Sequence, residues 1–284
     1  MIVSFHPCFV ADRNLNCAGR RPGAEDLAAI KKAAAVVLPQ GCGKLLYQLA
    51  RQNCRHIFPN YDARFACPDK TGQAELFRQK KVAFPLTETF ANLKAFKDRY
   101  DDLDRAPFGY PLVFKFAWGG EGDNVHLIDS FSDFEKVLAQ AGSYERTGQF
   151  GFLLQEYVRS DNRSLRVVVV GESLISYWRI QNDRHNFQAS LKKGALIDAD
   201  ADSGLQARAK KAVRGFCEKT GINLAGFDLL FARGPGGSKE KEPLFLEINY
   251  FFGRQGLGGS EKYYALLNRE IERWLDSLGL AVGR

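Results

Sequence analysis

The chain lacks the sequence features of membrane-spanning and secreted proteins. No apolar run among its 284 residues approaches the length of about 20 that a membrane-spanning helix needs. The N-terminal segment "MIVSFHPCFV" has neither a basic start nor a small-residue cleavage site, which predicts a first β-strand rather than a signal peptide. Six cysteines occur without a Cys-x-x-Cys pair or a His-linked zinc spacing, so we expect reduced thiols and a cytoplasmic protein.

Clustered positive charge is also missing, although the net charge is +7. The chain contains no run of five basic residues and no RNA-binding signature. An excess of positive charge suits anionic ligands such as nucleotides, and it is equally compatible with a basic surface of no specific function. We therefore expect neither a nucleic acid nor a membrane as a partner. The sequence leaves open whether the protein forms an oligomer.

The sequence does contain a mixture of helical and strand patterns, which predicts an α+β fold. A length of 284 residues suits two or three packed subdomains. Residues 1–68 are predicted to form a small α/β unit with strands at "MIVSFHPCF" and "AVVLPQGCG". Further along, "SDFEKVLAQAG" predicts a helix with Ser132 at its N-cap, because a glutamate follows three residues later. The last two helices are expected at residues 205–219 and 260–278.

Two strands near the C-terminus carry acidic and amide side chains on one face. They flank the loop "ARGPGGSKEKEP", which predicts a β-hairpin. If Ala232 lies opposite Pro243, then Asp228 lies opposite Glu247. Asn249 shares the face of Glu247, because side chains two apart in a strand point the same way. Two carboxylates this close repel each other unless a cation lies between them, and hard oxygen ligands favour Mg²⁺. The alternative is a group of polar residues on the protein surface.

A lysine in the middle of an apolar strand precedes a run of glycines. In "FKFAWGGEGDNV", Lys115 is followed by Gly119, Gly120 and Gly122. A buried ammonium needs an anionic partner, and glycines let backbone N–H groups come close to phosphate. The segment therefore predicts a phosphate site. The alternative is a hairpin turn with a lysine whose ammonium stays in water.

The order of these motifs resembles that of the ATP-grasp superfamily. From about residue 67 to about residue 260 the chain presents, in sequence, "PDK", "PLVFKFAWGGEGDNV", "LLQEYV", "LRVVVVGESLISYWR", "AGFDLLFA" and "FLEIN". The set is similar to that of ribosomal-protein glutamate ligases, and more distantly to glutathione synthetases and D-alanine:D-alanine ligases. The resemblance implies an ATP-grasp fold, in which two α+β lobes grip ATP. The smaller lobe would cover about residues 69–154 and the larger lobe about 155–284, after a shortened preceding domain at 1–68.

The resemblance also implies roles for individual residues. The lysines that bind ATP phosphates correspond to Lys70 and Lys115. The loop that closes over the phosphates corresponds to Gly119, Gly120 and Gly122. The inter-lobe hinge that holds adenine corresponds to Gln155, Glu156, Tyr157 and Val158. The Mg²⁺ ligands correspond to Asp228, Glu247 and Asn249. Two Mg²⁺ ions are expected, with Mn²⁺ as an alternative metal.

The chain departs from this family where the substrate would bind. The family commonly has Asn-x-Ser-Pro-Gly after the acidic ligand, whereas this chain has "NYFFGRQGLGG". The Asp-Ile-Arg of the glutamate ligases is replaced by "SLR", which leaves Ser164 or Asp161 as the candidate for the ribose contact. The family's Arg-x-Asn segment appears as "NFQASLKKGA", with Gln188 and Ser190 in place of the arginine and asparagine.

Four basic residues are candidates for the cation that a developing acyl phosphate requires. Arg179 is retained from the family pattern, and Lys192 or Lys193 could replace the missing arginine. Arg254 borders the substrate region and is a candidate clamp for a carboxylate. The alternative for Arg254 is an ordinary surface arginine.

These features predict an ATP- and Mg²⁺-dependent carboxylate–amine ligase. In the family reaction a carboxylate attacks the γ-phosphate of ATP, and an amine or another nucleophile then captures the acyl phosphate. The expected partners are a small-molecule or peptide carboxylate and an amine acceptor, drawn from amino acids, peptides or related metabolites. One alternative is a small-molecule kinase, in which an alcohol attacks the γ-phosphate. Another is a nucleotide-binding module without turnover, against which the complete set of three metal ligands argues.

Overall fold

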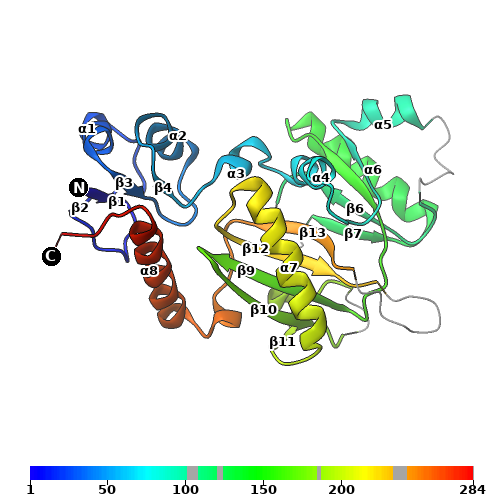
Figure 1. Cartoon of the computed structure of the whole chain (residues 1–284). Helices are drawn as coiled ribbons and strands as arrows, with labels where there is room; N and C mark the ends of the chain where they lie inside the picture. Colours follow the sequence, from blue (N-terminus) through cyan, green and yellow to red (C-terminus); the bar gives the residue numbers. More distant parts are fainter. Residues whose placement is uncertain (101–107, 120–123, 184–186, 233–241, 284) are drawn as a thin grey trace.

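The computed structural model describes residues 1–100, 108–119, 124–183, 187–232 and 242–283. The strands of this part of the chain form three sheets, arranged in a row along the molecule (Figure 1). A parallel sheet lies at the N-terminal end, a five-stranded antiparallel sheet in the middle and a four-stranded antiparallel sheet at the far end. The predicted α+β class is confirmed. Within the described ranges, no helix is both long and apolar enough to cross a membrane.

The N-terminal sheet has four short parallel strands in the order β2-β1-β3-β4. They are β1 (Ile2–Ser4), β2 (Arg13–Asn14), β3 (Ala35–Val37) and β4 (Ile57–Phe58). The helices of this unit are α1 (Ala24–Lys32), α2 (Lys44–Asn53) and α3 (Asp62–Ala66). The first strand is shorter than the predicted nine residues. The Ser4 hydroxyl accepts a hydrogen bond from the His6 N–H at 3.1 Å, and Pro7 has no N–H with which to continue a ladder.

The four-stranded antiparallel sheet, hereafter the smaller sheet, has the order β5-β8-β6-β7. Its strands are β5 (Thr87–Phe90), β6 (Leu112–Phe116), β7 (Val125–Ile128) and β8 (Phe152–Glu156). Its aromatic core is shared with two helices, α5 (Leu93–Arg99) and α6 (Phe131–Arg146). The prediction of Ser132 as the N-cap of α6 was wrong. Ser130 caps the helix instead, because its hydroxyl accepts from the Asp133 N–H at 3.2 Å and the helix has already begun at Phe131.

The five-stranded antiparallel sheet, hereafter the larger sheet, has the order β11-β10-β9-β12-β13. Its strands are β9 (Arg163–Val170), β10 (Ser173–Ile180), β11 (Leu196–Asp198), β12 (Leu224–Leu230) and β13 (Leu244–Asn249). Short 3₁₀ turns lie at Leu191–Lys193 and Gln255–Leu257, and helix α7 (Ser203–Thr220) covers one face of the sheet (Figure 1).

The predicted hairpin register is correct where it matters for the site. Asp228 lies opposite Glu247, as expected. A β-bulge follows at once, so that Leu229 pairs with Phe245. Between the bulge and the loop, the observed register therefore differs by one residue from the predicted register, which paired Ala232 with Pro243.

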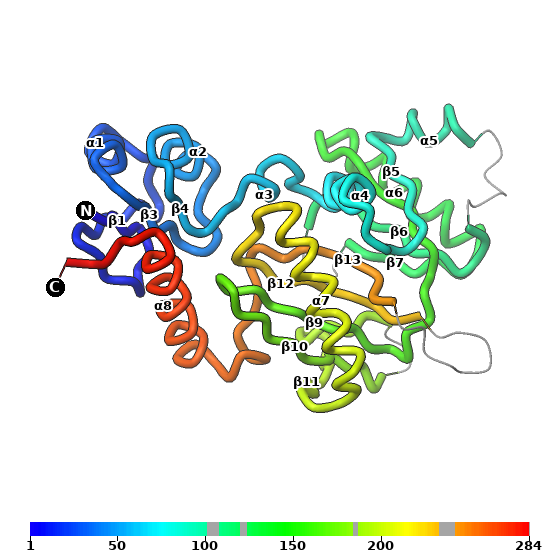
Figure 2. The backbone as a smooth tube through the Cα atoms, viewed as in Figure 1, coloured from blue at the N-terminus to red at the C-terminus, as the bar shows by residue number. Residues whose placement is uncertain are grey.

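The N-terminal sheet and the larger sheet share their hydrophobic cores. One core joins Val3 to Phe216 of α7, and a second joins Ile2 to Val168 and to helix α8 (Ser260–Ser277). Helix α8 returns the chain to the N-terminal unit (Figure 2), where the Gly283 N–H donates to Asp12 Oδ1 at 2.7 Å. Helix α4 (Lys70–Gln79) contacts β5 and β8 of the smaller sheet as well as β13 of the larger one. The domain boundaries at residues 68 and 154 stay predictions.

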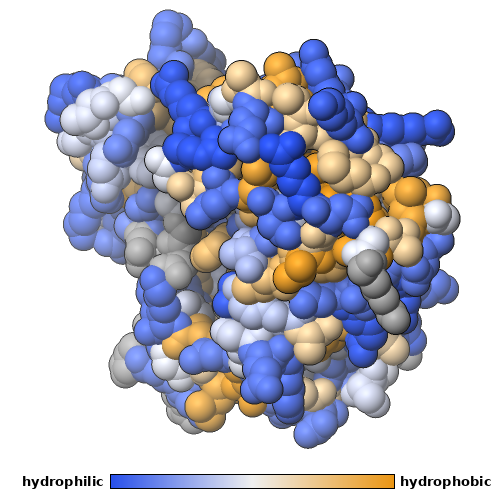
Figure 3. Space-filling view, turned by 90° about the vertical axis from the view of Figure 1, so that its left-hand side faces the viewer, coloured by the Kyte–Doolittle hydropathy of each residue, from blue (hydrophilic) through white to orange (hydrophobic). Residues whose placement is uncertain are grey.

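The N-terminal end of the molecule has a mixed surface. Figure 3 shows hydrophilic side chains on this face, interspersed with smaller apolar groups. Val10 and Leu45 of the N-terminal unit are 79% and 56% exposed. Single exposed apolar residues are common on soluble domains and need no ligand to explain them.

Candidate nucleotide-binding site

A cavity of about 420 Å³ lies between the two antiparallel sheets. The smaller sheet contributes Lys115 and Gln155, and helix α4 contributes Lys70. The larger sheet contributes polar and charged residues from four strands, namely Ser164, Arg166, Arg179, Asp228, Glu247 and Asn249. Residues that the sequence analysis selected from distant segments therefore meet in one place.

Asp228 is buried between two arginines on the cavity side of the larger sheet. Arg166 of β9 binds both of its carboxylate oxygens, with Nε 2.5 Å from Oδ1 and Nη2 2.9 Å from Oδ2. Arg179 of β10 places Nη2 at 2.7 Å from Oδ1. Burial by itself would raise the pKa of Asp228, but the two guanidinium groups outweigh it and hold that pKa below its usual range.

These two arginines reduce the repulsion between the carboxylates of Asp228 and Glu247. Two opposed carboxylates suggested an external cation, whereas the chain itself supplies two positive charges beside Asp228. Arg166 was missed by the sequence analysis. Its signal was a charged residue inside the apolar run "LRVVVV", the same kind of signal that identified Lys115.

Glu247 and Asn249 extend from β13 into the same cavity. Asn249 Nδ2 donates to Asp228 Oδ2 at 3.1 Å, so the carboxamide oxygen is the atom that would ligate a cation. Glu247 forms no hydrogen bond or ion pair with any described residue. Its charge nevertheless favours the protonated forms of Lys70 and Lys115.

The carboxylate of Glu247 and the carboxamide oxygen of Asn249 fit a hard divalent cation, because Mg²⁺ prefers oxygen ligands. Asp228 already accepts from Arg166, Arg179 and Asn249, so it would ligate a metal by giving up one of these bonds. In the part of the chain that the structure describes, no three His, Cys, Asp or Glu side chains gather closely enough to hold a metal. A metal ion at Asp228, Glu247 and Asn249 would therefore complete its coordination with phosphate oxygens or water.

Lys115 is buried in the smaller sheet and held in place by a chain of hydrogen bonds. The residue is only 7% exposed, and Nζ donates to Gln155 Oε1 at 2.7 Å. Gln155 in turn donates from Nε2 to Thr87 Oγ1 at 2.8 Å. Burial lowers the pKa of Lys115 to about 8, with Glu247 opposing and Lys70 adding to the effect. A buried ammonium in this position gains more from a bound anion than an exposed one would.

Lys70 is the first residue of α4 and contacts the start of the glycine-rich segment. Its Nζ donates to the carbonyl oxygens of Trp118 at 3.2 Å and Gly119 at 2.8 Å. Gly119 has φ +83°, and a Cβ at this position would lie 2.2 Å from the Asn124 side chain. Both facts favour glycine here. Gly120 and Gly122 of the predicted loop lie outside the described residues.

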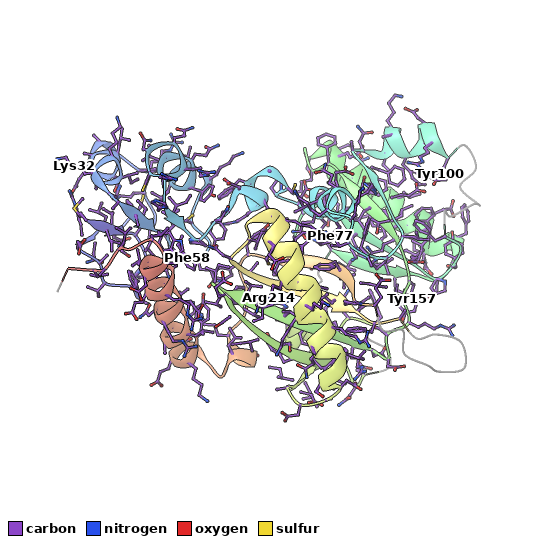
Figure 4. All side chains as sticks on the ribbon, viewed as in Figure 1. Lys32, Phe58, Phe77, Tyr100, Tyr157 and Arg214 are labelled. Carbon is purple, nitrogen blue, oxygen red and sulfur yellow. The ribbon has the colours of Figure 1, made fainter. Side chains whose placement is uncertain are left out.

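The predicted hinge residues Gln155, Glu156, Tyr157 and Val158 all line the cavity. Glu156 Oε1 accepts from the Leu86 N–H at 2.8 Å, which ties the end of β8 to the start of β5. Tyr157 follows β8 on the segment that leads to β9 of the larger sheet (Figure 4). This placement agrees with a connection between the two lobes.

Of the two ribose candidates, the structure brings Ser164 to the cavity. Ser164 Oγ is buried and accepts from Arg179 Nη2 at 2.9 Å. Asp161 is exposed, has φ +54° and does not line the cavity.

The four candidate catalytic cations separate into two groups. Arg179 and Lys192 line the cavity, whereas Lys193 and Arg254 do not. The Arg254 guanidinium instead packs over the Tyr264 ring, 4.5 Å from its centroid. Any catalytic role for these four residues stays a prediction.

A cationic cavity between two antiparallel sheets, with acidic and amide side chains along one wall, defines a protein of the ATP-grasp class. The chain belongs to the family of RimK-like ATP-grasp domains, which residues 67–271 match. The predicted superfamily and fold are confirmed.

Two relatives are similar in sequence over part of their length, and one solved structure shares the fold. The probable alpha-L-glutamate ligase 1 of Shewanella baltica is 26% identical over 190 residues, covering 66% of this chain and 57% of the relative. Beta-citrylglutamate synthase B of Danio rerio is 27% identical over 224 residues, covering 75% of this chain and 51% of the relative. The chain thus matches little more than half the length of these relatives. The D-alanine–D-alanine ligase of Bacillus anthracis complexed with ATP has a TM-score of 0.62 at 16% identity, covering 93% of this chain and 85% of that one.

Proposed function

We propose that the protein is an ATP-dependent carboxylate–amine ligase. The observation that carries this proposal is the charge of the cavity: six basic and three acidic side chains line it. The excess of positive charge suits a polyphosphate, and membership of the ATP-grasp family identifies that polyphosphate as ATP. The basic residues are Lys70, Lys115, Arg163, Arg166, Arg179 and Lys192.

The proposed reaction has two steps. A carboxylate oxygen of the first substrate attacks the γ-phosphorus of ATP, the bond to the bridging oxygen breaks, and ADP leaves. The amine nitrogen of the second substrate then attacks the carbonyl carbon of the acyl phosphate. Phosphate leaves, the nitrogen loses a proton, and an amide results. Both steps concentrate negative charge on phosphoryl oxygens, which fixed cations stabilise.

Different residues of the cavity would bind the phosphates, the adenine and the metal. Lys70 and Lys115 bind the phosphates, and Tyr157 and Val158 border the adenine. Glu247 and Asn249, with Asp228, would hold Mg²⁺, which neutralises phosphate charge when bound. The ammonium of Lys115 is buried before ATP arrives, so its position is fixed in advance by Gln155.

Arg179 is the proposed cation for the acyl phosphate, with Lys192 as a second contributor. Arg179 is supported by its place in the cavity and its ion pair with Asp228. Lys192 is supported by lining the same cavity from the segment that follows β10. Lys193 donates to Gln188 and Arg254 packs over Tyr264, and because neither lines the cavity, both are set aside as direct contacts.

The proposed amine substrate is glutamate or a peptide with a related terminus. Relatives at 26% and 27% identity are named as a probable glutamate ligase and as beta-citrylglutamate synthase. Both names place glutamate in the product. A basic cavity also suits a substrate that carries more than one carboxylate.

The test is ADP release from ATP with Mg²⁺ and a panel of carboxylates, each with and without glutamate as the amine. Release that requires both a carboxylate and glutamate supports the ligase. Release that requires an alcohol instead would identify a kinase. Binding of ATP without ADP release from any combination would contradict an enzymatic function. Each arm is repeated with Lys115→Met, which should lose the signal.

A further inference from the structure

Helix α4 is joined to β13 by one buried glutamine. Gln73 Nε2 donates to the carbonyl oxygen of Ile248 at 3.0 Å, and Gln73 Oε1 accepts from the Ile248 N–H at 2.8 Å. Gln73 is 8% exposed. Strand β13 is the last strand of the larger sheet, so these two main-chain groups face away from the sheet and have no further strand to bond. Gln73 therefore satisfies both groups as an additional strand would.

The position of Ile248 gives this contact a functional meaning. Ile248 lies between Glu247 and Asn249, the two metal-ligand candidates of β13. Neighbouring side chains of a strand point to opposite faces, so the main chain of Ile248 sets the direction in which both flanking side chains point. Fixing that main chain at its N–H and its C=O fixes the spacing and orientation of the pair.

The same helix carries a phosphate-binding candidate three residues earlier. Lys70 donates its main-chain N–H to the Ala117 oxygen at 3.3 Å, and its Nζ contacts Trp118 and Gly119. One end of α4 is thus bonded to the segment after β6, and Gln73 bonds the next turn to β13 of the larger sheet. Helix α4 therefore carries the phosphate-binding candidate Lys70 and is bonded to the strand that carries the metal-ligand candidates.

Packing keeps α4 in register with the larger sheet. Phe77, four residues after Gln73, lies between α4 and the larger sheet (Figure 4), with its ring centroid 5.5 Å from that of Phe245. Phe245 N–H also donates to the Ala83 oxygen at 2.8 Å. The edge of β13 is therefore held at Phe245 and at Ile248 independently.

We propose that Gln73 is a positioning residue that holds Glu247 and Asn249 in the geometry needed to bind the metal of a metal–ATP complex. This inference rests on the proposed function only in taking these two residues as metal ligands. It does not depend on which reaction follows, because a kinase or a non-catalytic nucleotide-binding module would need the same geometry. Groups that orient metal ligands commonly affect metal affinity by about 10–100-fold.

The test compares Gln73→Met with the wild-type protein. Methionine keeps a similar length and removes both hydrogen bonds to Ile248. Binding of Mn²⁺ is measured by electron paramagnetic resonance in the presence of a non-hydrolysable ATP analogue. We expect the Mn²⁺ dissociation constant to rise by about 10–100-fold, while affinity for the analogue without metal changes by less than about two-fold. Gln79→Met is the matched control, because Gln79 is exposed on the same helix and bonds only to Glu75 among the described residues.

Amide hydrogen exchange provides a readout at the contact itself. In Gln73→Met the Ile248 amide should exchange faster, whereas the Phe245 amide, bonded to Ala83, should keep its wild-type rate. A second variant, Gln73→Glu, keeps the acceptor for the Ile248 N–H and places a carboxylate against the Ile248 carbonyl. In Gln73→Glu the Ile248 amide should still exchange slowly, because its acceptor is kept. Mn²⁺ should still bind more weakly, because the Ile248 carbonyl has lost its donor.

Three results would overturn the proposal. One is a folded Gln73→Met or Gln73→Glu protein with wild-type Mn²⁺ affinity. The second is faster exchange at Ile248 without any change in metal binding. The third is unfolding of both variants, which would assign Gln73 to stability alone. Absence of ADP release with every substrate pair would contradict the ligase function and leave this comparison of metal affinities intact.

Discussion

A Lys115→Met variant should be more stable than the wild-type protein and bind ATP less tightly. Burial lowers the pKa of Lys115 from 10.5 to about 8. That difference of about 2.5 in pKa corresponds to roughly 3 kcal/mol of unfavourable free energy for keeping the ammonium charged in the folded protein at neutral pH. Methionine removes the charge at similar length, but it leaves Gln155 Oε1 without its donor, which costs about 1 kcal/mol. The net gain is roughly 2 kcal/mol, or about 3 °C in Tm for a chain of this size.

The pH dependence of this gain follows from the direction of the pKa change. Below pH 8 the lysine is protonated in both the folded and the unfolded chain, so the full cost is present. Between about pH 8 and pH 10.5 the unfolded chain binds more protons than the folded one, and the stability of the wild-type protein rises with pH. Above pH 10.5 the cost is gone. The stability difference between variant and wild type should therefore shrink from pH 7 to pH 10.

Urea unfolding at pH 7 and pH 10 measures the stability difference, and calorimetry measures ATP binding. Loss of a charge-assisted contact worth about 1.5–3 kcal/mol predicts roughly 10–100-fold weaker binding of ATP. Lys136→Met is the control, because Lys136 has a side chain that is 72% exposed and should change neither quantity. A Lys115→Met protein that is less stable than wild type and binds ATP equally well would refute the reasoning. A stability gain that does not vary with pH would show that the charge is not its source.

Three further variants test other parts of the cavity. Glu247→Gln should abolish the strengthening of ATP binding by Mg²⁺, measured by calorimetry with and without EDTA; an unchanged Mg²⁺ effect would remove Glu247 from the metal site. Arg179→Met should lower ADP release by about 10²–10³-fold and leave ATP affinity within a few-fold, because Arg166 still pairs with Asp228. Wild-type turnover of Arg179→Met would move the catalytic role to another cation. Arg254→Gln should leave ADP release unchanged and raise the pKa of His6, which burial and then Arg254 lower to about 4. Nuclear magnetic resonance follows the imidazole, and a loss of ADP release would return Arg254 to the substrate site.

Long helices were predictable from the sequence, and short strands were not. The helices expected at 205–219 and 260–278 occur at Ser203–Thr220 and Ser260–Ser277. Their apolar spacing repeats over several turns, so local pattern and tertiary packing agree. The segment "MIVSFHPCF" has a strand pattern over nine residues but forms only three residues of strand. The hydrogen bond from the His6 N–H to the Ser4 hydroxyl ends it and cannot be recognised from hydrophobic periodicity, whereas Pro7, which cannot donate to a neighbouring strand, is visible in the sequence.

The pairing of Asp228 with Glu247 was predicted from a register that is not uniform along the hairpin. The assumed anchor at the loop end is one residue away from the observed pairing, and the bulge after Asp228 restores agreement at the site. A bulge of this kind depends on how the whole sheet twists, so it could not be predicted from the sequence of the hairpin alone. The predicted contact is correct because Asp228 and Glu247 lie on the far side of the bulge.

Contacts between distant segments were the hardest part of the site to predict, although one residue of each contact can be recognised in the sequence. Arg166 bonds a residue 62 positions away, and Gln73 bonds one 175 positions away, so no spacing rule connects either pair. Both residues, however, stand where the pattern calls for an apolar side chain. Arg166 interrupts a buried strand, and Gln73 shares the buried face of α4 with Phe77, four residues later. Burying a polar group is unfavourable unless it is hydrogen-bonded or paired, so a polar residue on an apolar face must have a partner elsewhere in the fold. The same reasoning that selected Lys115 from the sequence would have selected Arg166 and Gln73, and only the folded chain identifies Asp228 and Ile248 as their partners.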